Sequence, residues 1–337
     1  MKIHYGFENV DSLKNPVITT GSFDGVHIGH KTILNRINEI ASIIQGESVL
    51  ITFHPHPRKV LFPETAGKNL LLINTQREKI ELLSKTGLDH LIIVKFTREF
   101  SEISSIDFIR NILVNKLHAK KVVIGFNHHF GHNREGNFDY LYELGQYYNF
   151  GVEEILEQDV HQETVSSTVI RKALLEGKIQ RANAYLDHHY IVIGELGEGS
   201  ASLKALDFPT YRIPVTEDSK LVPPDGVYAV SVLVDNVYYK GILNIKNSLP
   251  PEIRKMEEIH LDLHLFDELG IENAAAACVL PDSKPVIEKI SFHKMLKGKE
   301  ATVFFVKKIR DELDFNSKDE MKLRLANDLQ EVEELIY

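Results

Sequence analysis

The sequence lacks several features that mark whole classes of protein. Its 337 residues include a single cysteine, Cys278, so no internal disulfide can form, which fits a reducing compartment. Its longest apolar runs, such as residues 91–94, fall far short of the ~20 residues of a membrane helix. The N-terminus has no basic and then apolar leader. We therefore expect a cytoplasmic protein with no membrane association.

Excess positive charge is also missing. The chain has 39 Lys and Arg against 48 Asp and Glu, a formal net charge of -9. A broad nucleic-acid-binding face is therefore not expected, because such faces neutralise phosphates with basic side chains. Any anionic ligand must be held by a local pocket. The 43% of hydrophobic residues is ordinary for a globular protein, and the length predicts about two domains.

The first half alternates short apolar runs with longer amphipathic stretches, which predicts a parallel α/β sheet. The expected strands are residues 17–20, 48–53, 90–95, 121–125 and 151–155, and the expected helices are 31–44, 76–86, 105–116, 137–148 and 168–176. Ligands of open α/β sheets bind beyond the carboxyl ends of the strands. We therefore expect the functional residues in the loops that follow these strands.

The second half is β-rich and contains no internal repeat. Apolar runs at residues 228–234, 237–245, 259–266 and 301–306 are separated by turn residues, which predicts a small β-barrel. The charged stretch 318–336 has a helical period and predicts a terminal helix packed on that barrel. We expect two domains, residues 1–186 and residues 187–337.

A turn rich in glycine and histidine follows the first expected strand, where residues 21–30 read GSFDGVHIGH. Glycines permit a tight turn and close approach to a ligand, and a helix start offers N–H groups and a positive dipole end to phosphates. His27 and His30 lie on one side of that helix start, where imidazoles can stabilise charge on an attacked phosphorus. The alternative is a pair of capping or core histidines.

Three further segments follow in order along the chain. Residues 52–58 read TFHPHPR, residues 125–136 read GFNHHFGHNREG, and residues 165–171 read VSSTVIR. With the H-x-G-H element, they make the sequence resemble the nucleotidyltransferases marked by that element. Within that superfamily it resembles the bacterial bifunctional riboflavin kinase/FMN adenylyltransferases, over nearly the whole chain. The resemblance implies a Rossmann-like nucleotidyltransferase domain followed by a riboflavin-kinase-like β-barrel with a terminal helix.

The resemblance also implies a reaction, the transfer of the adenylyl group of MgATP to FMN to give FAD and pyrophosphate. It implies that His27 and His30 stabilise the α-phosphoryl group and that Arg171, with Ser166 and Thr168, holds the leaving pyrophosphate. The other expected contacts to ATP or flavin are Gly21, Phe23, Asp24, Gly25, Gly29, His56, Pro57, Arg58, Asn127, Phe130 and Ser167. No Cys/His cluster has metal-ligand spacing, so we expect magnesium to arrive bound to the phosphates.

Each segment also has a plainer interpretation. The hydroxyls at 166–168, one turn before an arginine, suit the β- and γ-phosphates of ATP, but they also make an ordinary helix N-cap. Pro55 and Pro57 stiffen either a ligand wall or a surface turn. Phe126 and Phe130 either flank a flat ring or belong to the core. His129 stands where many relatives of the resembled family carry arginine.

The barrel half departs from the resembled family, in which it phosphorylates riboflavin. Three of its positions, Thr210, Asn244 and Asp262, correspond to family site positions and are treated as vestiges of a kinase site. Arg212 replaces an asparagine beside the metal and offers no acceptor to a cation. Asp262 stands in place of a glutamate base and is one methylene shorter.

Two more departures in this half weigh against ATP binding. Leu203 and Asp207 replace glycines at which the backbone passes close to phosphate in the resembled family, and Asp207 adds a like charge. Lys246 also replaces the last residue of an N-I-G turn. These changes predict a lost or altered riboflavin kinase activity.

Two other functions stay open at this point. A divergent paralogue of such enzymes would bind flavin or nucleotide without turnover, in a regulatory or storage role. A transferase acting on another phosphorylated acceptor, such as pantetheine phosphate or nicotinamide mononucleotide, would share the H-x-G-H chemistry, although the 126–131 loop and the barrel argue against it.

Overall fold

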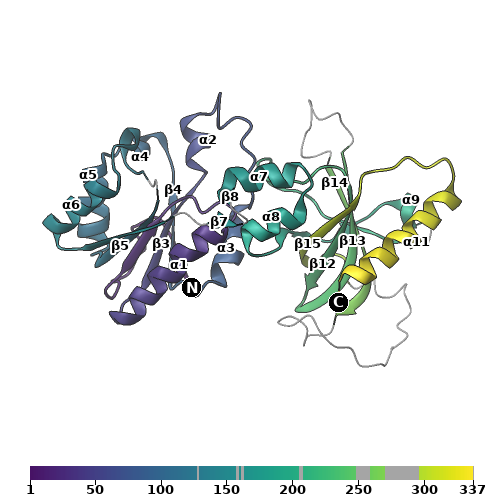
Figure 1. Ribbon diagram of the computed structural model, residues 1–337, viewed down its shortest axis with the longest axis horizontal. Coiled ribbons are helices and arrows are strands. Elements are labelled where there is room, and N and C mark those ends of the chain that lie inside the picture. Colours follow the sequence, from purple (N-terminus) through teal and green to yellow (C-terminus); the bar gives the residue numbers. More distant parts are fainter. Residues whose placement is uncertain are drawn as a thin grey trace. The chain divides into compact units, whose positions relative to one another are not determined.

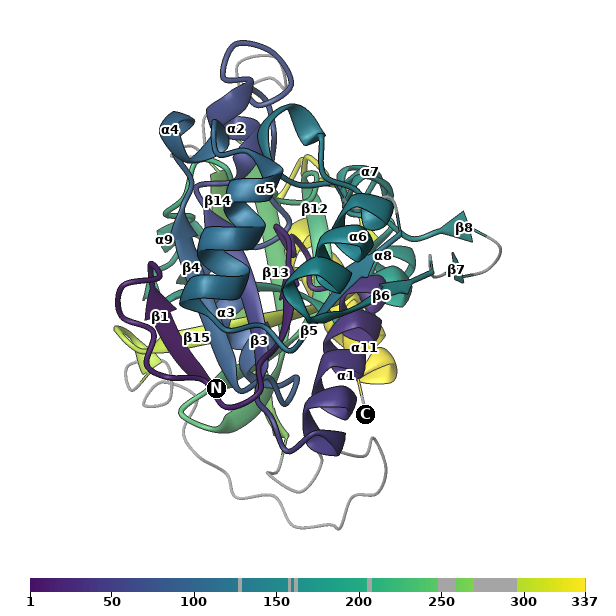
Figure 2. The ribbon, with the colours of Figure 1, turned by 90° about the vertical axis from the view of Figure 1, so that its left-hand side faces the viewer.

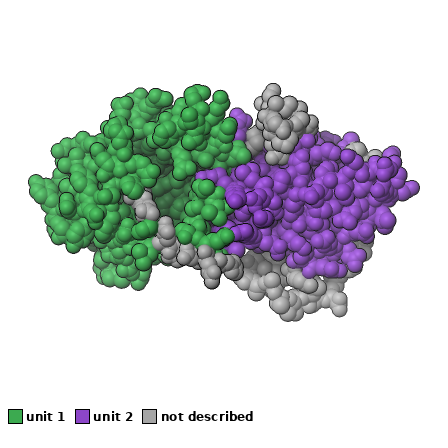
Figure 3. All heavy atoms as spheres, turned by 45° about the horizontal axis from the view of Figure 1, so that its top comes forward, with its two compact units in different colours: residues 1–169 green, residues 170–337 purple. Residues whose placement is uncertain are grey.

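The computed structural model of the chain divides into two compact units, residues 1–169 and 170–337, drawn green and purple in Figure 3. It describes residues 1–126, 129–156, 159–160, 163–204, 208–247, 259–269 and 296–336. Cys278 lies outside these residues. No helix among them is both long enough and apolar enough to cross a membrane.

Unit 1 is built on a six-stranded parallel sheet in the order β1-β4-β3-β2-β5-β6 (Figures 1 and 2). The strands are β1 Lys2–Tyr5, β2 Val17–Thr20, β3 Ser48–His54, β4 His90–Lys95, β5 Lys121–Gly125 and β6 Gly151–Ile155. All five strands predicted in this half are confirmed. The strand order runs outward in both directions from β2, so the loop after β2 lies at the topological switch point of the sheet, where such folds bind ligands.

The helices of unit 1 cover both faces of this sheet. They are α1 Ile28–Ile43, α2 Pro57–Leu61, α3 Gln76–Ser84, α4 Arg98–Ser101, α5 Ser105–Asp107, the π-helix η1 Phe108–Lys116, the 3-10 helix η2 His132–Arg134 and α6 Phe138–Tyr148. One apolar cluster joins α1 and α3 to the sheet through residues such as Leu34 and Leu83. A second cluster joins η1 and α6 to it through Leu113 and Leu141. The sheet is therefore buried on both faces, as its apolar strands require.

The first strand and part of one helix differ from the sequence-based prediction. β1 was missed because it is an edge strand in which only His4 is buried, so it carries no apolar run. The predicted helix 105–116 begins as the short α5 and continues as η1, in a wider π-helical winding.

Helix α7, Ser167–Leu175, and the short hairpin of β7 Asp159–Val160 and β8 Glu163–Thr164 follow β6. Unit 2 then contains α8 Ile179–Leu186, β9 Tyr190–Glu195, β10 Gly197–Glu198, α9 Ala201–Lys204, β11 Tyr211–Arg212, β12 Gly226–Val234, β13 Val237–Asn247, β14 Ile259–Leu269, β15 Glu300–Arg310 and α11 Lys318–Leu335. Its sheet has the order β10-β11-β14-β13-β12-β15-β9. All its neighbouring strands pair antiparallel.

The two edge strands of this second sheet, β10 and β9, are separated along the chain by Leu196 alone, which is fully buried. The sheet therefore curls back on itself until its edges meet at that residue, as expected of a small barrel. The terminal helix α11 packs against β12 and β13 (Figure 1). The fold class predicted from the sequence is thus confirmed for both halves.

An ion pair fastens α11 to the barrel. The Arg310 guanidinium on β15 donates to the fully buried Asp328 carboxylate on α11 at 2.8 Å, beside an apolar cluster that includes Val332. Arg324, one turn earlier on α11, approaches the same carboxylate at 3.0 Å. The mostly polar helix α11 therefore depends on one buried carboxylate as well as on its narrow apolar face.

We expect Asp328→Ala to lower the free energy of unfolding by about 3–5 kcal/mol, because it leaves the Arg310 charge buried without its partner. Urea unfolding followed by tyrosine fluorescence measures the effect. The control is Asp311→Ala, which removes an exposed carboxylate that pairs with Lys308 and should leave the unfolding curve unchanged. Equal curves for the two variants would contradict this role of Asp328.

Candidate active site

The loop between β2 and α1 has an unusual backbone. Phe23, Gly25 and Val26 all have positive φ, at 49°, 92° and 42°. A glycine adopts this region freely, but a phenylalanine and a β-branched valine do so only under constraint. The side chains of Phe23 and Val26 are 2% and 1% exposed, so their burial in the core holds the loop in this conformation.

This loop delivers two histidines to the start of α1. His27 is the N-cap residue and His30 lies in the first turn of the helix. Their rings stack with the centroids 3.6 Å apart. The Phe23 ring also stacks on the His30 ring, at 4.4 Å between centroids. Among the described residues, Nδ1 of His30 is buried and has no hydrogen-bond partner. The predicted pair is therefore brought together at the helix start, with a ring nitrogen of His30 left over for a ligand.

The surroundings of His30 keep its imidazole neutral. Burial of the ring is the largest cause that lowers the pKa of His30 well below its usual value, and the nearby His27 and Lys79 lower it further. A neutral imidazole carries one N–H donor and one acceptor, whichever tautomer is present. It can therefore donate one N–H to a phosphoryl oxygen while the ring carries no charge of its own.

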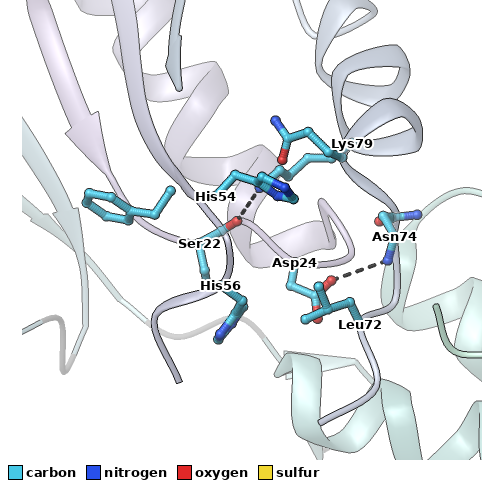
Figure 4. Close-up of a pocket in the computed structure, with 9 residues that line it drawn as sticks. Ser22, Asp24, His54, His56, Leu72, Asn74 and Lys79 are labelled. Atoms are coloured by element: carbon cyan, nitrogen blue, oxygen red, sulfur yellow. Dashed lines mark hydrogen bonds between the residues drawn. The ribbon is translucent and has the colours of Figure 1, made fainter. Parts of the chain in front are cut away.

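Asp24 ties the loop to two other segments of unit 1. Its carboxylate accepts a hydrogen bond from the backbone N–H of Ile73 at 3.0 Å and another from that of Asn74 at 3.3 Å. Figure 4 shows the bond to Asn74. Its backbone carbonyl accepts from the Ser167 hydroxyl at 2.9 Å. The structure thus joins the H-x-G-H loop directly to the S-S-T element, which lies more than a hundred residues later in the sequence.

A lysine that sequence reasoning missed lies beside this loop. Lys79 of α3 is only 7% exposed, and its ammonium donates to the Ser22 carbonyl at 3.2 Å and to the Thr52 hydroxyl at 3.3 Å. Its place in an amphipathic helix gave no sign of burial. Only the structure reveals its burial, because α3 begins directly after the segment that the Asp24 carboxylate holds.

A small pocket opens beside these groups, and Figure 4 shows the side chains that line it. They are Ser22, Asp24, Phe53, His54, His56, Leu72, Asn74, Gln76 and Lys79. His56 also accepts a hydrogen bond from the backbone N–H of Arg58 and so caps α2, whose first residue is Pro57. The second predicted segment therefore lies beside the first, with His56 in the pocket wall.

The third segment combines a core contact with a polar cluster. Phe130 packs 6.2 Å from Phe108 between ring centroids, and a Cβ on Gly136 would come within 2.6 Å of the Phe130 ring. Next to it, the Arg134 guanidinium lies 3.3 Å from the His129 ring nitrogen. A permanent cation thus lies beside His129, the position at which the resemblance leads us to expect an arginine. Asn127, the expected flavin contact, lies outside the described residues.

The S-S-T-x-I-R element forms the start of α7. The Ser166 hydroxyl accepts from the Val169 backbone N–H at 3.4 Å, so it caps the helix as the plainer interpretation expected, while Thr168 is exposed. The compact units divide between residues 169 and 170, so Arg171 belongs to unit 2. Its action on the same phosphates as His27 and His30 stays a prediction.

The remaining predicted residues of the first loop have structural roles that the pattern did not reveal. Gly21 lies under the Phe23 ring, where a Cβ would approach the ring to 3.0 Å, and Gly29 lies beside the His27 ring at 3.3 Å. Their contacts to a nucleotide stay predictions. No group of three or more His, Cys, Asp or Glu side chains in the described part of the chain is arranged to hold a metal ion.

In unit 2, the three vestiges line one pocket. Thr210, Asn244 and Asp262 all face it, together with the apolar Leu203, Phe208 and Val227. The register places Asn244 and Arg212 opposite Asp262 on its two neighbouring strands. Oδ1 of Asn244 is buried, with no hydrogen-bond partner within the described ranges. Asp207, an expected departure, lies outside those ranges.

Arg212 and Asp262, which lie opposite each other on β11 and β14, form an ion pair. The Arg212 guanidinium donates to both oxygens of the Asp262 carboxylate, at 3.1 and 3.3 Å from Nη2, and Nε adds a third contact at 3.2 Å. Asp262 is only 9% exposed. The two residues that depart from the resembled kinase pattern at this place therefore neutralise each other.

Comparison with known proteins agrees with this architecture. The FAD synthetase family model matches residues 10–169, and the riboflavin kinase family model matches residues 186–336. One solved structure, a macrolide-efflux protein from Streptococcus pneumoniae, superposes with a TM-score of 0.79 over 99% of this chain and 98% of that chain. At 22% identity, that likeness shows the fold alone.

Curated relatives match nearly the whole chain. The bifunctional riboflavin kinase/FMN adenylyltransferase of Buchnera aphidicola subsp. Acyrthosiphon pisum is 33% identical over 98% of this chain and 96% of its own length. The protein of the same name from Listeria monocytogenes is 30% identical over 94% and 91%, and that from Escherichia coli K12 is 29% identical over 97% and 96%. The chain therefore belongs to the family of bifunctional riboflavin kinase/FMN adenylyltransferase enzymes.

Proposed function

We propose that this chain transfers the adenylyl group of MgATP to FMN. An oxygen of the FMN phosphate attacks the α-phosphorus of ATP, the bond to the bridging oxygen of the β-phosphate breaks, and FAD and magnesium pyrophosphate leave. The observation that supports this most strongly is the stacked His27–His30 pair at the switch point, joined to the S-S-T element through the Ser167–Asp24 hydrogen bond. The family membership supports the same substrates.

Such a transfer needs alignment and charge stabilisation and no covalent intermediate on the protein. His27 and His30 donate to the α-phosphoryl oxygens as negative charge grows there. Ser166, Thr168 and Arg171, with the N–H groups at the start of α7, hold the leaving pyrophosphate. Magnesium enters with ATP and is carried by the phosphates.

The flavin is held on the other side of the site in this proposal. Asn127 and Phe130 contact its ring system, and His56, Pro57 and Arg58 form part of the wall beside it. The Arg134 cation next to His129 supports this, because it supplies positive charge near the position where relatives of the family carry arginine. We further propose a cytoplasmic enzyme, which the single cysteine supports.

We propose that the domains span residues 1–186 and 187–337. The match to the riboflavin kinase family begins at residue 186, where helix α8 ends, and this supports the boundary. The compact units divide earlier, between residues 169 and 170.

We propose in addition that the riboflavin kinase half of this chain is impaired. A general base must present a carboxylate to the hydroxyl that it deprotonates. Here the Asp262 carboxylate is shorter than the family's glutamate and is held by Arg212 in a three-contact ion pair. Such a pair engages both oxygens of the carboxylate with a guanidinium, so they are less available to accept a proton from a substrate hydroxyl.

We expect His30→Ala to lower kcat for FAD formation by about 10²- to 10³-fold, because it removes a donor aimed at the developing charge. Product chromatography from FMN and MgATP measures this, with pyrophosphate release as the second readout. The control is His118→Asn, at an exposed histidine that precedes the amino end of β5, whereas His30 follows the carboxyl end of β2. Wild-type turnover by a folded His30→Ala protein would remove His30 from the mechanism.

We expect Arg171→Ala to raise the KM for ATP or lower kcat, about tenfold or more in kcat/KM, because a charge-assisted hydrogen bond to phosphate is lost. The matched control is Lys172→Ala, which removes an exposed cation from the next position of the same helix. If both variants keep wild-type ATP kinetics, Arg171 does not contact the triphosphate.

For the kinase half, we expect the wild-type protein to form little FMN from riboflavin and MgATP. The double variant Arg212→Asn with Asp262→Glu restores the family's residues at both positions and should raise FMN formation by about tenfold or more. Chromatography of the flavin products reports both half-reactions in one experiment. Rapid FMN formation by the wild-type protein would refute the impairment.

A further inference from the structure

Lys79 makes a compact hydrogen-bonded triangle under the H-x-G-H loop. Its ammonium donates to the Ser22 carbonyl and to the Thr52 hydroxyl, and the Thr52 hydroxyl donates in turn to the same Ser22 carbonyl at 3.2 Å. Figure 4 shows the Lys79 side chain reaching toward Ser22. One ammonium thus joins α3, the end of β3 and the loop that follows β2.

This contact lies immediately before the residue that supports His30. Ser22 precedes Phe23, whose ring stacks on His30 at 4.4 Å and whose backbone is in the left-handed region. On the far side of Phe23, the Asp24 carboxylate holds the segment that leads into α3. The segment before α3 and Lys79 within α3 therefore contact the loop on the two sides of the Phe23 ring. A capping box of Thr75 and Glu78 fixes the first turn of α3 between these two contacts.

Lys79 also acts on His30 through its charge. A buried ammonium raises the free energy of placing a second positive charge nearby, since water screens the interaction poorly there. His27 and Lys79 both lower the pKa of His30, in addition to the effect of burial. The other titratable side chains that line the pocket with Lys79 are Asp24, His54 and His56. The Asp24 carboxylate accepts two backbone N–H bonds, which direct it toward residues 73 and 74.

We propose that Lys79 is a positioning residue of the transferase site, which holds the Ser22–Phe23 turn against the ring of His30. Its catalytic consequence rests on the proposed adenylyl transfer, whereas its effect on His30 does not. A lysine in this place has two effects that a neutral side chain cannot combine. It supplies donors to the carbonyl of a strained turn, and it prevents the adjacent imidazole from taking a second proton.

The test begins with the protonation of His30, which requires no substrate. The Cε1–H resonance of His30 is assigned by its loss in His30→Gln and is followed by NMR from pH 4 to 8. Lys79→Met removes the charge at nearly constant volume and should raise the pKa of His30. Lys79→Arg keeps the charge and should return the titration toward wild type. Lys85→Met removes an exposed lysine at the end of the same helix and should change nothing.

The second readout is the acidic limb of kcat/KM for FAD formation. In the proposed mechanism the neutral form of His30 is the active one, so the acidic limb follows the pKa of His30. The limb should therefore move to higher pH in Lys79→Met together with that pKa and return in Lys79→Arg. If Lys79→Met does not fold, Lys79→Gln replaces it, since an amide can still donate to Ser22 without a charge.

The outcomes separate the two proposals. A folded Lys79→Met or Lys79→Gln protein whose His30 titration matches wild type overturns the role of Lys79, even if stability falls. A shifted titration in a protein whose wild type forms no FAD supports the role of Lys79 and overturns the adenylyl transfer. A shift in both readouts supports both.

Discussion

The candidate site depends on the strained loop between β2 and α1. Left-handed backbone at Phe23 and Val26 costs of order 1–3 kcal/mol at each residue. Full burial of each of these side chains contributes about 1.5–3 kcal/mol in return. Burial thus roughly offsets the strain, and the polar contacts of Lys79 with Ser22 and of residues 73 and 74 with Asp24 stabilise the loop further. The orientation of the His27 and His30 rings therefore depends on contacts with several elements of unit 1.

The sequence predicted those parts that short-range patterns determine. The strands β2 to β5 are short apolar runs buried on both faces, so the sequence predicts their positions. The next strand, β6, was predicted from the same alternation of strands and helices. The edge strand β1 could not, because Ile3 and Tyr5 are exposed and the strand forms only by pairing with β4. Lys79 could not either. A lysine in an amphipathic helix is usually solvated, and only the packing of α3 against the loop after β2 buries it.

The barrel half illustrates the same limit in another way. The sequence identified Arg212 and Asp262 as separate departures from the family, fifty residues apart. The antiparallel register of β11 and β14 places them directly opposite each other. Two departures that the sequence presents separately then become one internal ion pair, in which each residue explains how the other is tolerated. A lone Arg212 would have placed a guanidinium in this pocket without a counter-charge, and a lone buried Asp262 would have left a carboxylate without its charge partner.

The proposed site combines neutral hydrogen-bond donors, His27 and His30, with a permanently charged donor, Arg171. A permanent cation already binds the phosphates of ATP in the ground state, and only the part of this interaction that strengthens in the transition state lowers the barrier. Neutral imidazoles bind a diester-like phosphoryl group weakly and gain strength as charge grows on its oxygens. A neighbouring Lys79 that suppresses protonation of His30 therefore favours this differential binding. It shifts the role of His30 from holding ATP toward stabilising the transition state.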